Sequence, residues 1–262
     1  MKILNSTYKS SYKLYDLVSS VVKNTEVTEA EIRMLNKYID EVKLKYKDNF
    51  RILDLGCGTG RHLLYLSKQN LKTDCIDQSI GMIKVLKNKL KNNFRGELIN
   101  SSFLKHKFKN RYNLVYSFWN TINEMCLTKK SLYYFFRKLN SILDLDGIVV
   151  LNFDDINKFN YKNLEYEYQI QSENKNSVYI FHSKVEKFIK KINTTKTREK
   201  IYKITKNINE GQEHRKQIYN CFIHQRWWNI EEITKIAQKN NFSILSFEKI
   251  KVNDEFYLVL KK

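Results

Sequence analysis

The 262-residue chain is predicted to fold as an α/β protein with a doubly wound sheet and an antiparallel β insertion. Short apolar runs alternate with stretches of helical spacing through the first 153 residues, which is typical of βαβ units around a parallel sheet. Residues 164–226 alternate apolar and polar side chains instead, which is typical of antiparallel strands with one solvated face. Three of the seven glycines stand within five positions of a single predicted turn, at 56–60.

The elements follow from these periodicities in order. A helix is expected from about Thr28 to Lys47, and Thr28 with Glu31 is typical of a capping box at its start. Strands are expected at 51–55, 72–77, 96–100, 112–118 and 147–153, and helices at 79–91 and 128–143. After the insertion, a helix beginning near Asn229 and two closing strands at 243–250 and 255–262 complete the sheet. The predicted boundaries are therefore 1–153 and 227–262 for the sheet domain, and 154–226 for an insertion that acts as a lid.

The composition narrows the possible functions. The net charge of +19 comes mainly from lysines spread along the chain, which favours a solvated surface over a polyanion-binding stripe. The N-terminus lacks the apolar run of a secretory signal, and no apolar run reaches the length of about 18 residues that a membrane span needs. A cytoplasmic protein is expected. The four cysteines are scattered, without a CxxC pair, and predict free thiols and no metal site.

The glycine-rich segment 54–60 is predicted to turn from a strand into a helix. Glycine lets a ligand approach the backbone closely, and the helix start offers free N–H groups. Asp54 before the turn suits a cationic amino group. Asp77 ends the next strand, where a carboxylate can bind both hydroxyls of a ribose. An adenosine joined to a positively charged amino-acid tail describes S-adenosylmethionine.

The segments "ILDLGCGTG" and "CIDQSIGMI" together resemble the class I S-adenosylmethionine-dependent methyltransferases, and the resemblance covers nearly the whole chain. It implies a Rossmann-like seven-stranded sheet with the β insertion after the fifth strand. By this resemblance Gly56, Gly58 and Gly60 line the methionine portion of the cofactor. It also implies that Asp77 holds the ribose and that Met82 packs on the adenine.

Further cofactor contacts follow from the same resemblance. Many relatives carry a Gly-Asp pair after the third strand, but this chain has Ser101 and Ser102. Ser102 is therefore expected to accept an uncharged hydrogen bond from the adenine amino group, or a backbone N–H near Phe103 to bind the ring instead. The N-terminal "YKLYDLV" resembles a tyrosine-rich lid in which Tyr12 and Tyr15 close over the cofactor. The predicted cofactor-binding set also includes Asp54, Cys57, Gln78 and Phe118.

The segment "SFWNTINEMCL" lies where this family lines the methyl-transfer pocket, and the nearest subgroup is the small-molecule N-methyltransferases of amino-sugar and glycine or sarcosine type. Methyl transfer from a sulfonium depends on positioning the acceptor lone pair, and an amine or hydroxyl acceptor must also lose a proton. Glu124 is predicted to orient and deprotonate the acceptor, and Asn120 to position it. The alternative for Glu124 is a solvated charge at the start of a helix.

Two other functions stay open on the sequence alone. An RNA or protein methyltransferase is favoured by the basic charge and by Trp227 and Trp228. A non-catalytic S-adenosylmethionine-binding protein is favoured by the Ser101–Ser102 departure. The expected partner is a small-molecule methyl acceptor, with nucleic acid as the less favoured choice and no membrane. A monomer or a homodimer is expected.

Overall fold

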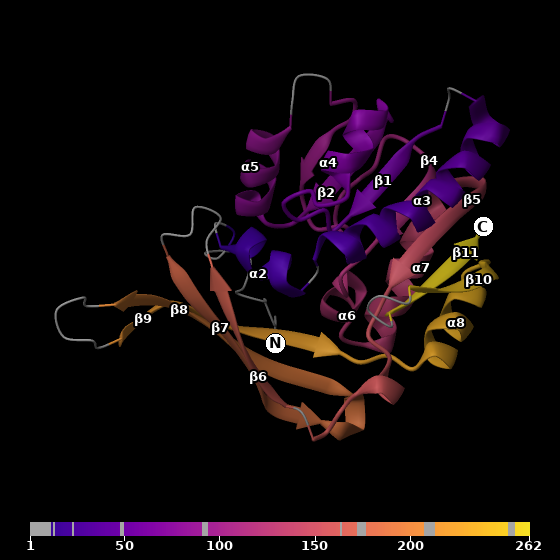
Figure 1. The fold of residues 1–262 in the computed structure, drawn as a ribbon. Coiled ribbons are helices and arrows are strands. Elements are labelled where there is room, and N and C mark those ends of the chain that lie inside the picture. Colours follow the sequence, from indigo (N-terminus) through magenta and orange to yellow (C-terminus); the bar gives the residue numbers. More distant parts are fainter. Residues whose placement is uncertain are drawn as a thin grey trace.

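The computed structural model describes residues 12, 14–22, 24–47, 50–90, 94–162, 164–171, 177–206, 213–250 and 255–262. Within these ranges a seven-stranded sheet with helices on both faces forms the larger layer, and a four-stranded antiparallel sheet lies below it (Figure 1). The predicted Rossmann-like architecture with an antiparallel β addition is confirmed.

The larger sheet has the order β10-β11-β5-β4-β1-β2-β3. Its parallel strands are β1 (Ile52–Leu55), β2 (Thr73–Asp77), β3 (Leu98–Asn100), β4 (Tyr112–Ser117) and β5 (Leu143–Asn152). The strands β10 (Ser243–Ile250) and β11 (Glu255–Lys261) close one edge, and β11 runs antiparallel to β5. The strand order reverses between β1 and β4, so their carboxyl ends form the crevice where such sheets bind ligands.

Two apolar layers hold helices to the sheet. On one face, α7 (Lys129–Ile142) and α8 (Ile230–Gln238) pack against side chains such as Leu53 and Val149. On the other face, α3 (Thr25–Tyr46) buries Ile32, Leu35 and Ile39 against β1, β4 and β5. The remaining elements of this layer are α4 (Leu63–Leu66), η2 (Ser67–Gln69), α5 (Ile80–Lys89) and α6 (Thr121–Met125). Each helix thus buries an apolar stripe, as its spacing predicts.

The predicted capping box at Thr28 and Glu31 is wrong. Helix α3 begins three residues earlier, and the side chain of Asn24 caps it by accepting a hydrogen bond from the Val27 amide at 3.0 Å. Glu31 is fully buried and binds other side chains instead. A threonine followed three residues later by a glutamate is compatible with a capping box and also with a buried carboxylate, and tertiary contacts decide between them.

The smaller sheet contains β6 (Glu165–Gln171), β7 (Val178–Ile189), β8 (Thr194–Lys206) and β9 (Glu213–Arg226), paired antiparallel in that order. Two short 3-10 turns, η3 (Ile156–Lys158) and η4 (Lys190–Ile192), precede and interrupt it. One face of this sheet packs on α2 (Tyr15–Val22) through Phe181, Ile201 and Tyr219. Helix α2 therefore lies between the two sheets (Figure 1). The division at 154 and 226 stays a prediction about domains.

No helix in the described ranges is long and apolar enough to cross a membrane. All four cysteines are buried, and none of them forms a disulfide. Among the described residues, no three His, Cys, Asp or Glu side chains gather in a way that could hold a metal ion.

Candidate active site

The glycine turn after β1 adopts a backbone that other residues rarely adopt. Gly56, Gly58 and Gly60 have φ angles of 78°, 54° and 87°. A side chain at Gly56 would come within 2.6 Å of Thr121, and one at Gly60 within 2.2 Å of Leu86. Gly60 therefore allows the turn to pack on α5, while Gly56 allows the close approach of α6.

A cavity of about 220 Å³ lies at the carboxyl ends of β1, β2 and β4, beside this turn. The residues that line it include most of the predicted cofactor set: Tyr15, Gly56, Gly58, Asp77, Gln78, Met82, Ser101, Ser102, Phe103 and Phe118. We call it the cofactor cavity. Its apolar side chains offer a surface for a flat ring, and its polar groups lie at the strand ends.

Two backbone amides hold the side chain of Asp77 at the C-terminal end of β2. Its Oδ2 accepts a hydrogen bond from the Gly58 N–H at 3.0 Å, and its Oδ1 accepts one from the Ser79 N–H at 2.7 Å. Burial raises the pKa of Asp77, while these two hydrogen bonds favour the charged form. Each carboxylate oxygen can accept a second hydrogen bond, so Asp77 remains able to bind a pair of hydroxyl groups.

A smaller cavity of about 30 Å³ adjoins the glycine turn on the side of α3. Asp54, Cys57 and Arg61 line it. Burial raises the pKa of Asp54 to about 7, so a cation beside it would favour its charged form. The opposite charges of Asp54 and Arg61 suit the ammonium and carboxylate groups of an amino-acid tail. The sequence analysis missed Arg61, although it directly follows the glycine turn.

Arg61 is held by a buried network around Glu31. The carboxylate of Glu31 forms an ion pair with Arg61 at 2.8 Å, and it accepts hydrogen bonds from His62 at 2.8 Å and from the hydroxyl of Tyr257 at 2.6 Å. Glu31 belongs to α3, Arg61 and His62 to the turn before α4, and Tyr257 to β11. His62 is thus a partner in a structural network.

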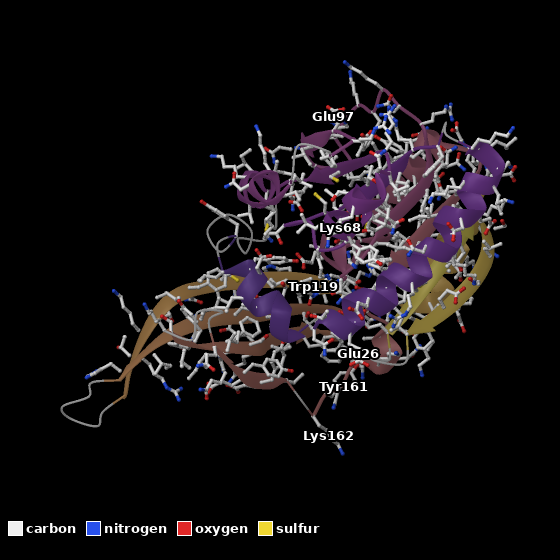
Figure 2. All side chains as sticks on the ribbon, turned by 45° about the horizontal axis from the view of Figure 1, so that its top comes forward. Glu26, Lys68, Glu97, Trp119, Tyr161 and Lys162 are labelled. Atoms are coloured by element: carbon white, nitrogen blue, oxygen red, sulfur yellow. The ribbon has the colours of Figure 1, made fainter. Side chains whose placement is uncertain are left out.

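Trp119 and Asn120 join β4 to α6 in a strained conformation. Both have positive φ angles, 53° and 56°, which is unusual for tryptophan above all. Two hydrogen bonds of Asn120 stabilise this conformation. Its backbone N–H donates to Asn152 at 3.2 Å, and its side-chain amide donates to Asp154 at 2.8 Å. The ring of Trp119 lies 5.2 Å from that of Tyr15, at the junction of the two sheets (Figure 2).

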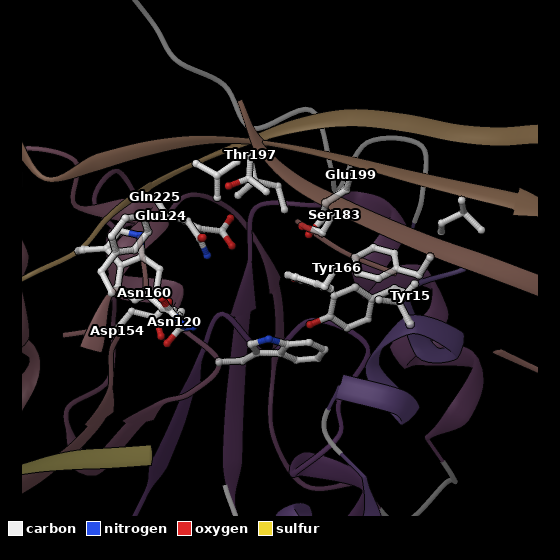
Figure 3. Close-up of a pocket in the computed structure, with 18 of the residues that line it drawn as sticks. Tyr15, Asn120, Glu124, Asp154, Asn160, Tyr166, Ser183, Thr197, Glu199 and Gln225 are labelled. Atoms are coloured by element: carbon white, nitrogen blue, oxygen red, sulfur yellow. Dashed lines mark hydrogen bonds between the residues drawn. The ribbon is translucent and has the colours of Figure 1, made fainter. Parts of the chain in front are cut away.

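A third cavity, of about 380 Å³, lies between α2, α6, the segment after β5 and the inner face of the four-stranded sheet (Figure 3). We call it the acceptor cavity. Tyr15, Trp119 and Glu124 line both this cavity and the cofactor cavity. The two cavities therefore meet at these three side chains.

Comparison with known proteins bears on this pair of cavities. Residues 52–147 match the family model described as a methyltransferase domain, from β1 into β5. An amino pentose methyltransferase from Micromonospora echinaspora, solved with S-adenosylmethionine bound, superposes with a TM-score of 0.74 over 95% of this chain and 96% of that chain, at 13% identity. The segment 52–147 thus matches a methyltransferase domain in sequence, and nearly the whole chain shares the fold of this solved methyltransferase. A sugar N-methyltransferase from Streptoalloteichus superposes with a TM-score of 0.69 over 100% and 95% of the two chains, also at 13% identity.

Sequence relatives cover a smaller part of the molecule. An uncharacterised protein of Methanocaldococcus jannaschii is 32% identical over 126 residues, which is 46% of this chain and 45% of that protein. The chain thus spans less than half the length of the curated relatives it matches. The matched methyltransferase domain and the fold together support an enzyme that depends on S-adenosylmethionine.

The structure brings most of the predicted site residues together, with two exceptions. Asp54 and Cys57 lie in the small cavity, and Asn120 and Glu124 line the acceptor cavity. Tyr12 and Gly60, both within the described ranges, line none of these cavities. The ring of Tyr12 packs instead on Gly81, where a side chain would come within 2.3 Å of it.

Two carboxylates of the acceptor cavity were missed by the sequence analysis, Asp154 and Glu199. Glu199 lies on β8 opposite Ser183 of β7 and Cys221 of β9, on the face that packs towards α2. The alternating pattern of β8 contained a signal for Glu199. Residues two apart on a strand lie on the same face, so Glu199 shares the inward face of Ile201 although it carries a charge. Burial, and next the charge of Glu124, raise the pKa of Glu199 to about 8.

Proposed function

We propose that this methyltransferase transfers a methyl group from S-adenosylmethionine to the nitrogen of a small-molecule amine. The main support is Glu124, because its side chain lines both cavities and so stands where a methyl donor and an acceptor would meet. The solved relatives include an amino pentose methyltransferase and a sugar N-methyltransferase, which agrees with an amine acceptor. The cytoplasmic location and the monomeric or dimeric state remain predictions from sequence.

The cofactor cavity and the small cavity beside it fit the successive parts of S-adenosylmethionine, from the adenine through the ribose to the methionine portion. Met82 and Phe103 offer apolar surface for the adenine, with Ser101 and Ser102 nearby as polar groups. Asp77 would accept hydrogen bonds from the ribose hydroxyls. Asp54 and Arg61 would then bind the ammonium and the carboxylate of the methionine portion.

Bound S-adenosylmethionine would supply an electrophilic methyl group. An ammonium acceptor first has to lose a proton, and Glu124 is the carboxylate placed to accept it. The nitrogen lone pair then forms the new N–C bond as the S–C bond breaks, and the sulfur keeps that electron pair as a neutral thioether. Asn120 positions the amine, since its buried Oδ1 accepts no hydrogen bond from any described residue.

Binding and transfer assays test this proposal together. Calorimetric titration is expected to show binding of S-adenosylhomocysteine and no comparable binding of NAD. Transfer of a labelled methyl group from S-adenosylmethionine to a panel of monoamines, diamines and amino sugars then tests the activity. Tighter binding of NAD than of S-adenosylhomocysteine would overturn the donor assignment.

The same transfer assay tests the role of Glu124. We expect Glu124→Gln to lower turnover by about 10²-fold or more, because the amide cannot accept the proton, and to leave affinity for S-adenosylhomocysteine unchanged. Glu231→Gln is the matched control, since Glu231 is an exposed carboxylate at the start of α8. Wild-type turnover in Glu124→Gln would remove Glu124 from the mechanism.

A further inference from the structure

We propose that the acceptor is a small unphosphorylated diamine whose second ammonium group is bound by Glu199. This inference rests on the proposed function, because it takes the nitrogen near Glu124 as the one that is methylated. Glu199 would then determine specificity from the far side of the acceptor cavity, and it would touch no reacting atom.

The positions of the two carboxylates support a two-point contact. Glu124 belongs to α6, which follows β4 of the large sheet, while Glu199 belongs to β8 of the small sheet. Both line the acceptor cavity, and Figure 3 shows them on different sides of it. Glu199 does not line the cofactor cavity, so a group bound to it lies away from the methyl donor.

Glu199 differs from the other described carboxylates of its sheet in having no partner. Its side chain makes no hydrogen bond or ion pair with the described part of the chain. Glu165 instead pairs with His182 and Lys184, and Glu186 with Arg198 and Lys196. A carboxylate withdrawn from water without a partner is unfavourable, and a bound cation is its natural complement.

The charge of the cavity argues against a phosphorylated acceptor. Its lining holds the carboxylates Glu124, Asp154 and Glu199, and Lys158 is the only cation among the described lining residues. Lys158 also lies with its Nζ atom 4.0 Å from the centre of the Phe256 ring, a position that favours a cation. The net negative charge of this lining would repel a phosphate group, and it would attract two ammonium groups.

Part of the wall of the acceptor cavity is apolar and suits a hydrocarbon spacer. Leu14 and Val18 line the cavity from α2 and the residue before it, and Phe181, Ile201 and Ile223 line it from the small sheet, beside polar side chains such as Ser183 and Thr197. An alkyl chain between two amino groups would bury apolar surface against the apolar side chains.

Calorimetry on the protein saturated with S-adenosylhomocysteine tests this inference without requiring turnover. The probes are diamines from 1,3-diaminopropane to 1,6-diaminohexane, each paired with the monoamine of equal length. We expect at least one diamine to bind about tenfold or more tightly than its monoamine, since one charge-assisted contact is worth that much. Glu199→Gln should abolish this preference, and Glu186→Gln, an exposed carboxylate on the outer face of the same sheet, should preserve it.

Proton release supplies a second readout. Below pH 8 the empty cavity keeps a proton on Glu199, and a bound second ammonium group should displace it. Titrations at pH 7 in two buffers of different ionisation enthalpy should show about one proton released by the wild-type protein beyond that released by Glu199→Gln. The other charged and titratable groups that line the cavity with Glu199 are Tyr15, Glu124, Asp154, Lys158, Tyr166 and Tyr219.

The outcomes separate this inference from the proposed function. Equal binding of diamines and monoamines, an undiminished preference in Glu199→Gln, or O-phosphoethanolamine binding as tightly as ethanolamine would each overturn it. Methyl transfer to diamines that is insensitive to Glu199→Gln would overturn the inference and leave the proposed function standing. Diamine binding that depends on Glu199, without methyl transfer to any of the amines, would overturn the proposed function and the inference that rests on it, and would leave Glu199 as a residue that binds an ammonium group.

Discussion

Glu31 at the cofactor end and Glu199 at the acceptor end are both carboxylates withdrawn from water, but their surroundings are opposite. Glu31 is fully buried, forms an ion pair with Arg61 and receives hydrogen bonds from His62 and Tyr257. Glu199 receives none from the described residues and faces an acidic cavity. A buried polar network that is fully satisfied makes one structure rigid, whereas an unsatisfied charge is unfavourable until a ligand completes it.

The two cavities differ in the same way. The cofactor cavity is lined by a glycine turn and strand ends, with Asp77 anchored on two backbone amides. The acceptor cavity is lined by side chains from two sheets and from α2, at positions from Leu14 to Trp227. The cofactor cavity therefore has fixed polar geometry, whereas the acceptor cavity is formed where separate elements dock, and we propose that its side chains distinguish one acceptor from another.

The largest expected effect is on the stability of the Glu31 network. Glu31→Gln should lower the free energy of unfolding by about 3–5 kcal/mol, because it leaves the buried guanidinium of Arg61 without a counter-charge. Urea denaturation followed by circular dichroism measures this change. Glu29→Gln is the control, since Glu29 is an exposed carboxylate on the same helix. A change below about 1 kcal/mol would show that the network does not hold the cofactor end together.

A somewhat smaller effect is expected on cofactor affinity at Asp77. Asp77→Ala should weaken the binding of S-adenosylhomocysteine by about 2–4 kcal/mol, because the charged acceptor for two hydroxyl groups is lost together with the partner of the Gly58 amide. Isothermal calorimetry gives the dissociation constant. Asp40→Ala, an exposed carboxylate on α3, should leave it unchanged. An unchanged dissociation constant in Asp77→Ala would show that Asp77 shapes the turn and does not bind the cofactor.

The smallest expected effect concerns the pH dependence of stability at Glu199. A carboxyl group whose folded pKa, here about 8, lies above its unfolded value makes the folded state less stable as pH rises between the two values. Glu199→Gln should therefore match the wild-type stability near pH 4 and exceed it by about 1 kcal/mol at pH 5, half a unit above the unfolded pKa of 4.5. Urea titrations at both pH values measure this difference. Equal stability at pH 5 would show that Glu199 is well solvated in the empty cavity.

The elements that depend on local patterns could be predicted from the amino-acid sequence alone. Strands β1 to β5, the antiparallel strands of the insertion and the closing pair all follow from periodicity, because each side chain's environment repeats with the geometry of its own element. The glycine turn, Asp54 and Asp77 were predictable for a related reason. They lie at the ends of adjacent parallel strands, which meet at one edge of any such sheet.

Only the tertiary structure decided which distant side chains face one another. The spacing of Thr28 and Glu31 suggested a cap, but the packing of α3 on the large sheet placed Glu31 against Arg61 and Tyr257 instead. Alternation along β8 could point Glu199 inward, yet it could not show that the inner face meets α2 and Glu124 across a cavity. Local patterns set the direction of a side chain relative to its own element, and the docking of elements onto one another determines what that side chain meets.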